Sequence, residues 1–380
     1  MKQLSIFCLC LCLCLSVVLV LAPHSHAASS KNYLKLGDKA IASKQFSLAE
    51  SYYIKAIKAD PKSAEAYAGR ARALIKQARP EPAIAVATQA LRCNPRYAQA
   101  YYLRAKALED RKDYKRTVRD ASLALKFDPK LVDAYAVRAR AHFYLGTLEG
   151  GDDSRLALAD LQKAVSLDPN HLDSLLYLGV LYAGKNKFKT AIKYFSRVLA
   201  IDPNHLRALR YRSVAYSSLK EEDKALADLS RAIKIQPGAS SMLQARANYY
   251  ESKGKLKLAF DDYTRALSAS PGNYRARYQR AKVAIDLKLY SMAIEDYTKI
   301  VNANGLDDEA LKRRGDAYFA IGKYQKALLD YNEAIGLNPK LSGYYSARAK
   351  AYARLGNNAA AAKDSKRAKQ LFKAPAVKKI

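Results

Sequence analysis

Apolar residues recur three and four positions apart in short blocks along this chain, and polar turns such as Gly254-Lys255 and Gly322-Lys323 separate the blocks. This spacing places apolar side chains on one face of a helix, so each block predicts a short amphipathic helix. A proline follows every second block, usually 34 residues after the one before: Pro61, Pro95, Pro129, Pro169, Pro203, Pro237, Pro271 and Pro339. The pattern therefore predicts pairs of helices repeated in line along the chain.

Two steps depart from this interval. The step from Pro129 to Pro169 is 40 residues, and Gly305 stands midway between Pro271 and Pro339, where a proline is expected. Within each repeat, position 8 is small and position 20 is alanine in all repeats but one, so the two helices can approach closely before the proline ends the second. We number the repeats one to ten, and they begin at Ser30, Ala64, Ala98, Val132, Leu172, Leu206, Ser240, Tyr274, Asp308 and Ser342.

This pattern resembles the tetratricopeptide repeat, whose motif is large-x2-Leu-Gly-x2-Tyr, then Ala-x3-aromatic, then Pro. Repeat five fits the motif with Leu175, Leu178, Gly179, Tyr182, Ala191, Phe195 and Pro203. The resemblance covers about residues 28–375 and implies an all-α fold, a right-handed superhelical α-solenoid of about ten helix-turn-helix repeats. Repeat eight has Arg277 at position 4, where the other repeats are apolar, and Gly305 in place of the proline. We expect it to be the loosest repeat.

Position 7 carries arginine in eight repeats, and seven of these carry aspartate at position 23. The predicted pairs are Arg104 with Asp120, Arg138 with Asp160, Arg212 with Asp228, Arg246 with Asp262, Arg280 with Asp296, Arg314 with Asp330 and Arg348 with Asp364. A planar guanidinium can bind a carboxylate bidentately. We interpret the pairs as ion pairs that fix the two helices of a repeat, not as a functional arginine surface. Arg70, opposite Val86, lacks such a partner.

The first residues have the three parts of a secretory signal peptide: Met1-Lys2, an apolar run over residues 4–22, and an ending Ser25-His26-Ala27 that suits cleavage after Ala27. A cleaved signal at residues 1–27 predicts export to the periplasm or out of the cell. The alternative is an uncleaved membrane anchor through residues 4–22, because the run is nearly long enough to span a bilayer. Cleavage leaves Cys93 as a lone thiol, which excludes an internal disulfide.

The chain has a formal net charge of +31 and a pI near 9.8. Nucleic acid is the usual partner of so basic a protein, but export argues against it. Anionic lipid head groups or envelope polymers remain as candidate partners. The alternative is that the basic surface binds no polyanion and only keeps the chain soluble. A basic tail at residues 376–380 ends the chain. From residue 363 onward, the chain has one acidic residue, Asp364, and seven basic residues: Lys363, Lys366, Arg367, Lys369, Lys373, Lys378 and Lys379.

The resemblance implies that positions 2, 5, 6, 9, 12 and 13 of each repeat face a concave groove. Charges of both signs occupy these positions, among them Asp38, Glu65 and Arg72, so the groove is mixed and only mildly basic. Aromatic side chains and arginines most often dominate binding energies. The candidate partner-binding residues are Tyr102, Arg140, Tyr144, Tyr177, Arg207, Arg210, Tyr211, Tyr278 and Lys312.

No cluster of histidine, cysteine and carboxylate residues has metal-ligand spacing, and no nucleophile is paired with a base. We therefore expect no enzymatic activity, no metal and no cofactor. The pattern predicts an exported scaffold that binds protein segments in its groove and supports assembly of an envelope or lumenal complex. The alternative is a basic surface protein that docks on an anionic membrane or cell-envelope polymer. The partner, the oligomeric state and the role of the repeat-four insertion stay open.

Overall fold

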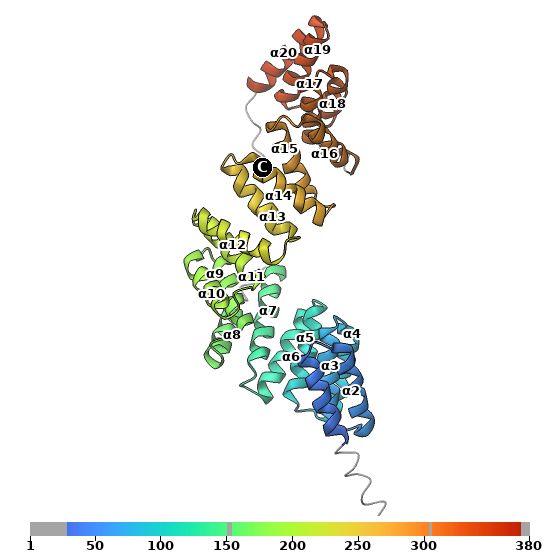
Figure 1. The fold of residues 1–380 in the computed structure, drawn as a ribbon, viewed down its shortest axis with the longest axis vertical. Coiled ribbons are helices and arrows are strands. Elements are labelled where there is room, and N and C mark those ends of the chain that lie inside the picture. Colours follow the sequence, from blue (N-terminus) through green and yellow to red (C-terminus); the bar gives the residue numbers. More distant parts are fainter. Residues whose placement is uncertain (1–28, 150–153, 304–305, 374–380) are drawn as a thin grey trace, which may run out of the picture. The chain divides into compact units, whose positions relative to one another are not determined.

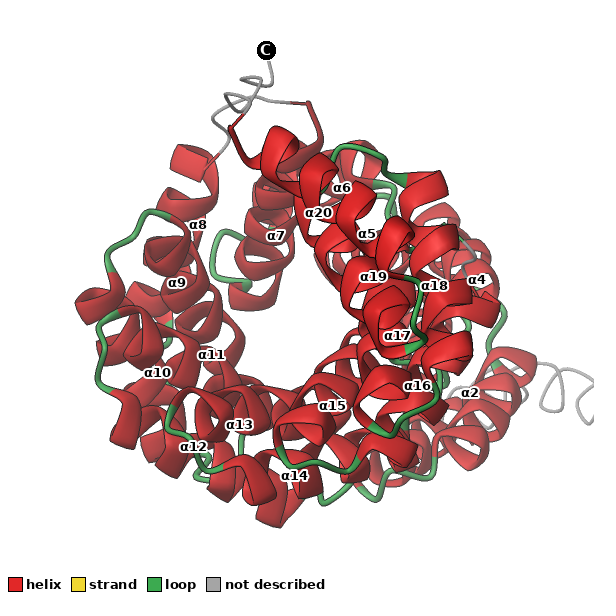
Figure 2. Ribbon diagram, turned by 90° about the horizontal axis from the view of Figure 1, so that it is seen from above, coloured by secondary structure: helices red, strands yellow, loops and turns green. Residues whose placement is uncertain are grey.

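The structure, a computed structural model, describes residues 29–149, 154–303 and 306–373. Every element among these residues is a helix, and short loops join the helices (Figure 2). The predicted signal segment, the centre of the repeat-four insertion, Gly305 and the basic tail lie outside the described residues. The packing divides the chain into two compact units, the first ending at Pro203 and the second beginning at Asn204.

The first compact unit starts with helical residues 29–42 and continues through the helices coloured blue to green in Figure 1. They are α2 (Phe46–Ala59), α3 (Ala64–Lys76), α4 (Pro80–Cys93), α5 (Ala98–Asp110), α6 (Tyr114–Phe127), α7 (Val132–Glu149), α8 (Ser154–Leu167), α9 (Leu172–Gly184) and α10 (Phe188–Ile201). The two helices of each repeat lie side by side, and the next repeat packs against them.

The second compact unit has the same construction. Its helices are α11 (Leu206–Ser218), α12 (Glu222–Ile235), α13 (Ser240–Ser252), α14 (Leu256–Ala269), α15 (Tyr274–Asp286), α16 (Tyr290–Ala303), α17 (Asp308–Ala320), α18 (Tyr324–Leu337), α19 (Ser342–Arg354) and α20 (Asn358–Lys373). From Ala64 of α3 to Ser342 of α19, the first helix of each repeat begins at the residue where the sequence repeat begins. The chain is an all-α solenoid of about ten repeats, as the sequence predicts.

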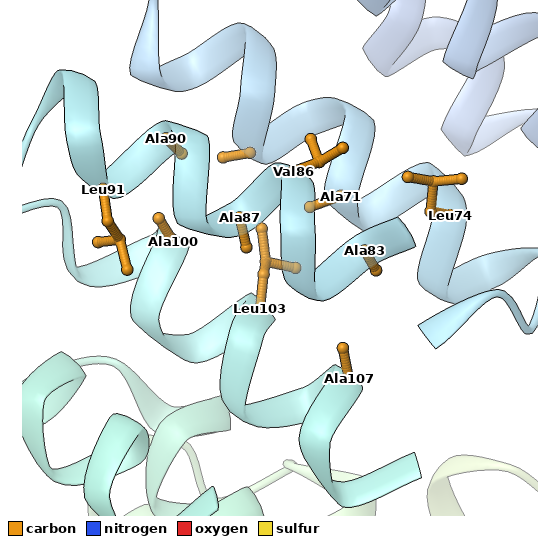
Figure 3. Close-up of a cluster of buried hydrophobic side chains, with 11 residues drawn as sticks. Ala71, Leu74, Ala83, Val86, Ala87, Ala90, Leu91, Ala100, Leu103 and Ala107 are labelled. Carbon is orange, nitrogen blue, oxygen red and sulfur yellow. The ribbon is translucent and has the colours of Figure 1, made fainter. Parts of the chain in front are cut away.

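Small residues build much of the core. In repeats two and three the buried cluster includes Ala71, Leu74, Ala83, Val86, Ala87, Ala90, Leu91, Ala100, Leu103 and Ala107 (Figure 3). The alanines of α3 and α4 bring these two helices close together. From α5, Ala100, Leu103 and Ala107, at positions 3, 6 and 10, pack on the face that α3 and α4 share. Each repeat is therefore stabilised by its neighbour.

Repeat eight accommodates its unusual arginine. The Nη1 atom of Arg277 lies 3.5 Å from Oδ1 of Asp296, the carboxylate that also binds Arg280. The repeat has a closed core that includes Tyr297 and Ile300. However, the hydroxyl of Tyr297 is buried and has no hydrogen-bond partner among the described residues. That this repeat is the loosest stays a prediction.

Candidate peptide-binding groove

All seven predicted Arg–Asp pairs form, and all are bidentate. In each of these seven repeats, the arginine Nε and Nη2 donate to the two carboxylate oxygens at distances between 2.6 and 3.0 Å. All seven aspartates are buried, and the most exposed of them, Asp160, is only 7% exposed. The pairs therefore join the two helices of a repeat, and the predicted ion pairs are confirmed.

Most of these arginines also contact the preceding repeat. Their remaining nitrogen, Nη1, approaches a polar side chain 16 residues earlier, at position 25: Thr88, Ser122, Ser230, Thr264, Thr298 or Asn332, at 2.8–3.4 Å. Arg70 cannot form such a bond, because Ile54 occupies that position before it. Arg70 instead lies 3.4 Å from Glu50 of repeat one. The position-7 arginines thus connect neighbouring repeats as well as the helices of one repeat.

In the first compact unit, Arg140 is a buried connector, 5% exposed. Its guanidinium binds Glu109 of repeat three at 2.5 and 2.8 Å and Asp173 of repeat five at 3.3 Å. It also lies 5.3 Å from the ring centre of Tyr177. Although burial disfavours the charge, the bonds to Glu109 and the nearby carboxylates raise the pKa of Arg140. Arg140 therefore orders the groove face across three repeats.

The predicted groove tyrosines of the first compact unit are packed to different degrees. Tyr102 fills a gap between buried clusters of repeats two to four, and this burial raises its pKa. Tyr144 stacks on Tyr114 with ring centres 5.0 Å apart. Tyr177 is half-buried against a cluster of repeats four and five. Of these, Tyr102 acts chiefly as core, while Tyr144 and Tyr177 keep a partly exposed edge.

In the second compact unit, the structure brings together Arg207, Arg210 and Tyr211. The Arg210 guanidinium lies 4.8 Å from the ring centre of Tyr211. Burial acts to raise the pKa of Tyr211, but hydrogen bonds with Arg210 and Arg207 and their positive charges outweigh it, and the pKa is lowered. Tyr278 packs edge-on against Tyr297 at 5.7 Å, and Lys312 binds Asp316 at 2.7 Å. These last two candidates lie in other repeats, away from the cluster.

The groove face of repeats one to three contains a pocket of about 380 Å³, which falls within the usual range for ligand pockets. Its apolar wall and its polar rim come from three repeats. The lining is Leu34, Asp38, Ile41, Ala42, Tyr53, Glu65, Ala68, Gly69, Arg72, Tyr97, Gln99 and Leu103. None of these residues belongs to the candidate set singled out from the sequence.

A hydrogen-bonded triad forms the polar end of this pocket. The Tyr53 hydroxyl donates to Asp38 at 2.7 Å, Arg72 Nη2 donates to the Tyr53 oxygen at 2.9 Å, and Arg72 and Asp38 form an ion pair. Burial, followed by the bond to Asp38, raises the pKa of Tyr53 to about 12. The Nε–H of Arg72 is buried and has no acceptor among the described residues. An incoming carbonyl or carboxylate oxygen would satisfy it.

Gly69 at position 6 is the sequence signal for this pocket. A Cβ atom there would lie 2.4 Å from the Tyr53 ring, so Tyr53 can pack in place only beside a glycine. Position 6 carries a side chain in every other repeat, from alanine to tyrosine. A missing side chain on the groove face could therefore have indicated the pocket.

Metal and membrane sites are not evident in the described parts of the chain. Within residues 29–149, 154–303 and 306–373, no group of three or more His, Cys, Asp or Glu side chains is placed to hold a metal ion. None of the helices described is both long and apolar enough to cross a bilayer.

Comparisons with known proteins agree with the observed fold. Models of the tetratricopeptide repeat match residues 40–107, 147–205, 181–240, 240–273 and 308–341. No curated protein matches the sequence. Among solved structures, PilF of Pseudomonas aeruginosa is 17% identical and aligns over 59% of this chain and 99% of its own, with a TM-score of 0.50.

Two further structures have lower TM-scores. YrrB, described as a tetratricopeptide repeat protein with an unusual peptide-binding site, is 28% identical over 51% of this chain and 97% of its own, with a TM-score of 0.39. MamA from Desulfovibrio magneticus RS-1, from residue 41 to its end, is 19% identical over 45% and 96%, with a TM-score of 0.43. The likeness to PilF supports the fold alone. With the family models matching more than half of its length, this chain belongs to the tetratricopeptide repeat family.

Proposed function

We propose that this protein is an exported scaffold that binds segments of partner proteins in the groove of its first compact unit. Tetratricopeptide repeat proteins are generally non-enzymatic scaffolds for protein–protein interaction, and we propose the same role here. The observation that carries the proposal is the pocket of about 380 Å³ in repeats one to three, with the unsatisfied Nε–H of Arg72 at its polar end.

The lining of the pocket indicates the kind of segment it accepts. Leu34, Ile41 and Leu103 offer an apolar wall for one large or two small side chains of an extended peptide. Arg72 offers a donor to a backbone carbonyl or an acidic side chain next to it. Further along the groove, the partly exposed edge of Tyr177 can add apolar contact, because Arg140 fixes its ring. The cluster of Arg207, Arg210 and Tyr211 is a separate candidate surface in the second compact unit.

Export places this scaffold in a cell envelope or lumen. The support is the signal-like segment at residues 1–27, which ends two residues before the first described helical residue. A scaffold with a preformed pocket, exported to that compartment, would hold the members of an envelope or lumenal complex together. The alternative location, an anchor through residues 4–22, would keep the same groove at the membrane surface.

The test fills the pocket without disturbing the core. Ala42 lines the pocket at position 13 and is exposed, so Ala42→Trp should obstruct the groove and abolish partner capture. Ala320→Trp is the matched control, because Ala320 is exposed at position 13 of repeat nine. The chain has no native tryptophan, so each variant also carries a single fluorescence probe.

Capture is measured by placing a photo-crosslinking amino acid at Gln99 of the exported protein and identifying the attached partner. We expect one dominant partner segment, captured by the wild type and by Ala320→Trp and lost in Ala42→Trp. Equal capture by both tryptophan variants would exclude the pocket as the binding site.

A second candidate function, docking on an anionic surface, is favoured by the last repeat. There the basic side chains of α20 have almost no acidic counterpart. The two functions use different parts of the chain, so one does not exclude the other.

A further inference from the structure

The exposed face of α20 is uniformly basic. Lys363, Lys366, Arg367 and Lys369 are all exposed, and none of them forms an ion pair with an acidic residue in the described parts of the chain. The single acid of the helix, Asp364, is 5% exposed and is bound bidentately by Arg348. Residues 363, 366 and 367 lie one helical turn apart on the same side, and Lys369 is beside them. Their charge is therefore presented outward without compensation.

Other second helices of the second compact unit are mixed in charge. In α12, for example, Lys224, Arg231 and Lys234 share the surface with Glu222 and Asp223. Lys224 also binds Glu221, just before that helix, at 2.6 Å. The single-sign face is thus a property of α20 and not of the repeat.

An apolar side chain projects beside this basic face. Phe372 is 84% exposed, more than any other large hydrophobic residue in the described parts of the chain. It follows Lys369 by three residues, so the two side chains are neighbours on the helix surface. Phe372 also borders a hollow of about 540 Å³ between α19 and α20, whose other lining residues are small or basic, such as Ala353, Ala361 and Lys350. The end of α20 therefore combines an exposed aromatic ring with surrounding positive charge.

This end face is not built to receive another repeat. Position 24 is buried in each of the first nine repeats, as Tyr53, Ala87, Ala121, Leu161, Phe195, Leu229, Tyr263, Tyr297 or Tyr331. In repeat ten it is Ser365, which is exposed, and position 28, apolar in the other nine, is Lys369. At these two positions, the apolar residues on which a following helix would pack are therefore absent.

A second copy of the chain does not fit the face either. Positions 3, 6 and 10, which dock on the preceding repeat, are Asn32, Lys35 and Lys39 in repeat one, and all three are exposed. Two copies of α20 would repel each other through their like charges. The complementary surface must be anionic and must accept an aromatic ring, and an anionic lipid bilayer meets both requirements.

We propose that the end of repeat ten docks on anionic lipid bilayers, with Phe372 entering the interface and Lys363, Lys366, Arg367 and Lys369 binding the head groups. Binding of this kind depends on salt, because exposed charges are screened within a Debye length. This inference does not depend on the pocket of the first compact unit, so each can fail without the other.

The experiment measures co-sedimentation of the chain from Ala28 on, which keeps every described helix and lacks the apolar run at residues 4–22. Vesicles of phosphatidylcholine with phosphatidylglycerol are compared with vesicles of phosphatidylcholine alone. We expect binding only to the anionic vesicles. Replacing the four bases of α20 with Gln should weaken that binding by roughly two orders of magnitude or more. Phe372→Ser should weaken it less, by about tenfold.

Matched controls separate this surface from the net charge of the protein. Lys220, Lys224, Arg231 and Lys234 are exposed around α12, and their replacement with Gln removes the same number of positive charges from another helix. Leu329→Ser removes a 64% exposed apolar residue from α18. Both controls should bind as the wild type does.

Three results would overturn the proposal: no binding to anionic vesicles, equal loss in both four-base variants, or unchanged binding by Phe372→Ser. The last would indicate a site for soluble polyanions instead of a bilayer.

Discussion

At the scale of single residues, the position-7 arginines contribute to two interfaces at once. Arg246 holds Asp262 at 2.7 and 2.8 Å with Nε and Nη2, and Ser230 of the preceding repeat at 3.2 Å with Nη1. Asp262 is 3% exposed, so neither charge is well hydrated. A buried ion pair is not by itself strongly stabilising, but the loss of one partner leaves an uncompensated charge. Removing one partner should therefore lower the free energy of unfolding more than replacing both partners together.

Asp262→Ala should lower the free energy of unfolding by about 1–3 kcal/mol, because Arg246 loses its carboxylate in a poorly hydrated site. The double variant Arg246→Leu with Asp262→Tyr copies Leu178 and Tyr194 of repeat five and should recover much of that loss. Urea titrations of the two single variants and the double variant measure the coupling. Additive effects would contradict the pair.

The pairs themselves were predictable because position 7 and position 23 covary from repeat to repeat within one chain. Their second contact was not predicted, although its signal is present, since Thr88 precedes Arg104 by 16 residues whereas Ile54 precedes Arg70. Finding it requires knowing that position 25 faces the next repeat. For the same reason, the sequence could place Arg140 on the groove face but not show that Glu109 and Asp173 neutralise it.

His171 forms another residue-scale link, and this one depends on pH. Its Nδ1 lies 3.3 Å from the backbone N–H of Ser174, from which the neutral ring accepts, and 2.8 Å from the Ser174 hydroxyl oxygen, to which the protonated ring donates. Its Nε2 lies 3.3 Å from Asp133. The bond to Asp133 is the main cause of a raised pKa of His171, and the bond to His171 is the main cause of a lowered pKa of Asp133. The folded chain therefore favours the pair of protonated imidazole and ionised carboxylate.

Because the pKa of His171 is raised on folding, its stabilisation is complete below about pH 6.5, the unperturbed value, and is lost as the pH rises through the folded pKa. His171→Asn keeps a side chain that can begin α9 and should flatten the decline in melting temperature above that pH. Asp133→Asn should flatten it equally. Circular dichroism melts across the pH range test this, and a wild-type profile in either variant would refute the link.

At the scale of helices and repeats, the position-24 tyrosines distinguish repeat eight from its neighbours. The hydroxyl of Tyr263 lies 2.6 Å from Asn248, and that of Tyr331 lies 3.0 Å from Asp316, both at position 9 of their repeats. In repeat eight, position 9 is Lys282, which binds Glu251 instead and offers no acceptor to Tyr297. A buried hydroxyl without a partner is destabilising.

Tyr297→Phe should leave the free energy of unfolding unchanged or raise it by up to about 1 kcal/mol, because no described hydrogen bond is lost. Tyr331→Phe is the matched control and should lower it by about 1 kcal/mol. Native-state hydrogen exchange of α15 and α16 then tests whether repeat eight opens first. Equal losses in the two variants, or the slowest exchange in repeat eight, would contradict this view.

The helices were the most predictable feature, because the prolines and the small residues at positions 8 and 20 repeat along the chain. The division at Pro203 was not predicted. Repeats five and six carry the usual proline and alanines, so the pattern shows no break between them. How tightly two repeats pack depends on how particular side chains fit, for example Leu103 against the alanines of α4, and the repeat pattern does not specify that fit.

At the scale of the whole molecule, the charge is distributed unevenly. The Arg–Asp pairs and the Glu109–Arg140–Asp173 contacts neutralise charges inside the repeats, whereas α20 presents its bases outward. Part of the net charge of +31 is therefore exposed on the last helix, where no acidic side chain balances it. Partner capture in the groove should accordingly survive high salt, whereas docking through α20 should not.

The proposed export is a property of the whole molecule, and it predicts a defined N-terminus. Residues 1–27 have the three parts of a signal peptide, and the described helices begin at residue 29. Cleavage after Ala27 would therefore remove the apolar run and leave every described helix intact. We expect the exported protein to begin at Ala28, as N-terminal sequencing can show. Ala27→Arg should block cleavage, because the peptidase site requires a small residue there, and should retain the precursor at the membrane. An intact Met1 on the wild-type protein in the membrane fraction would instead identify residues 4–22 as an anchor.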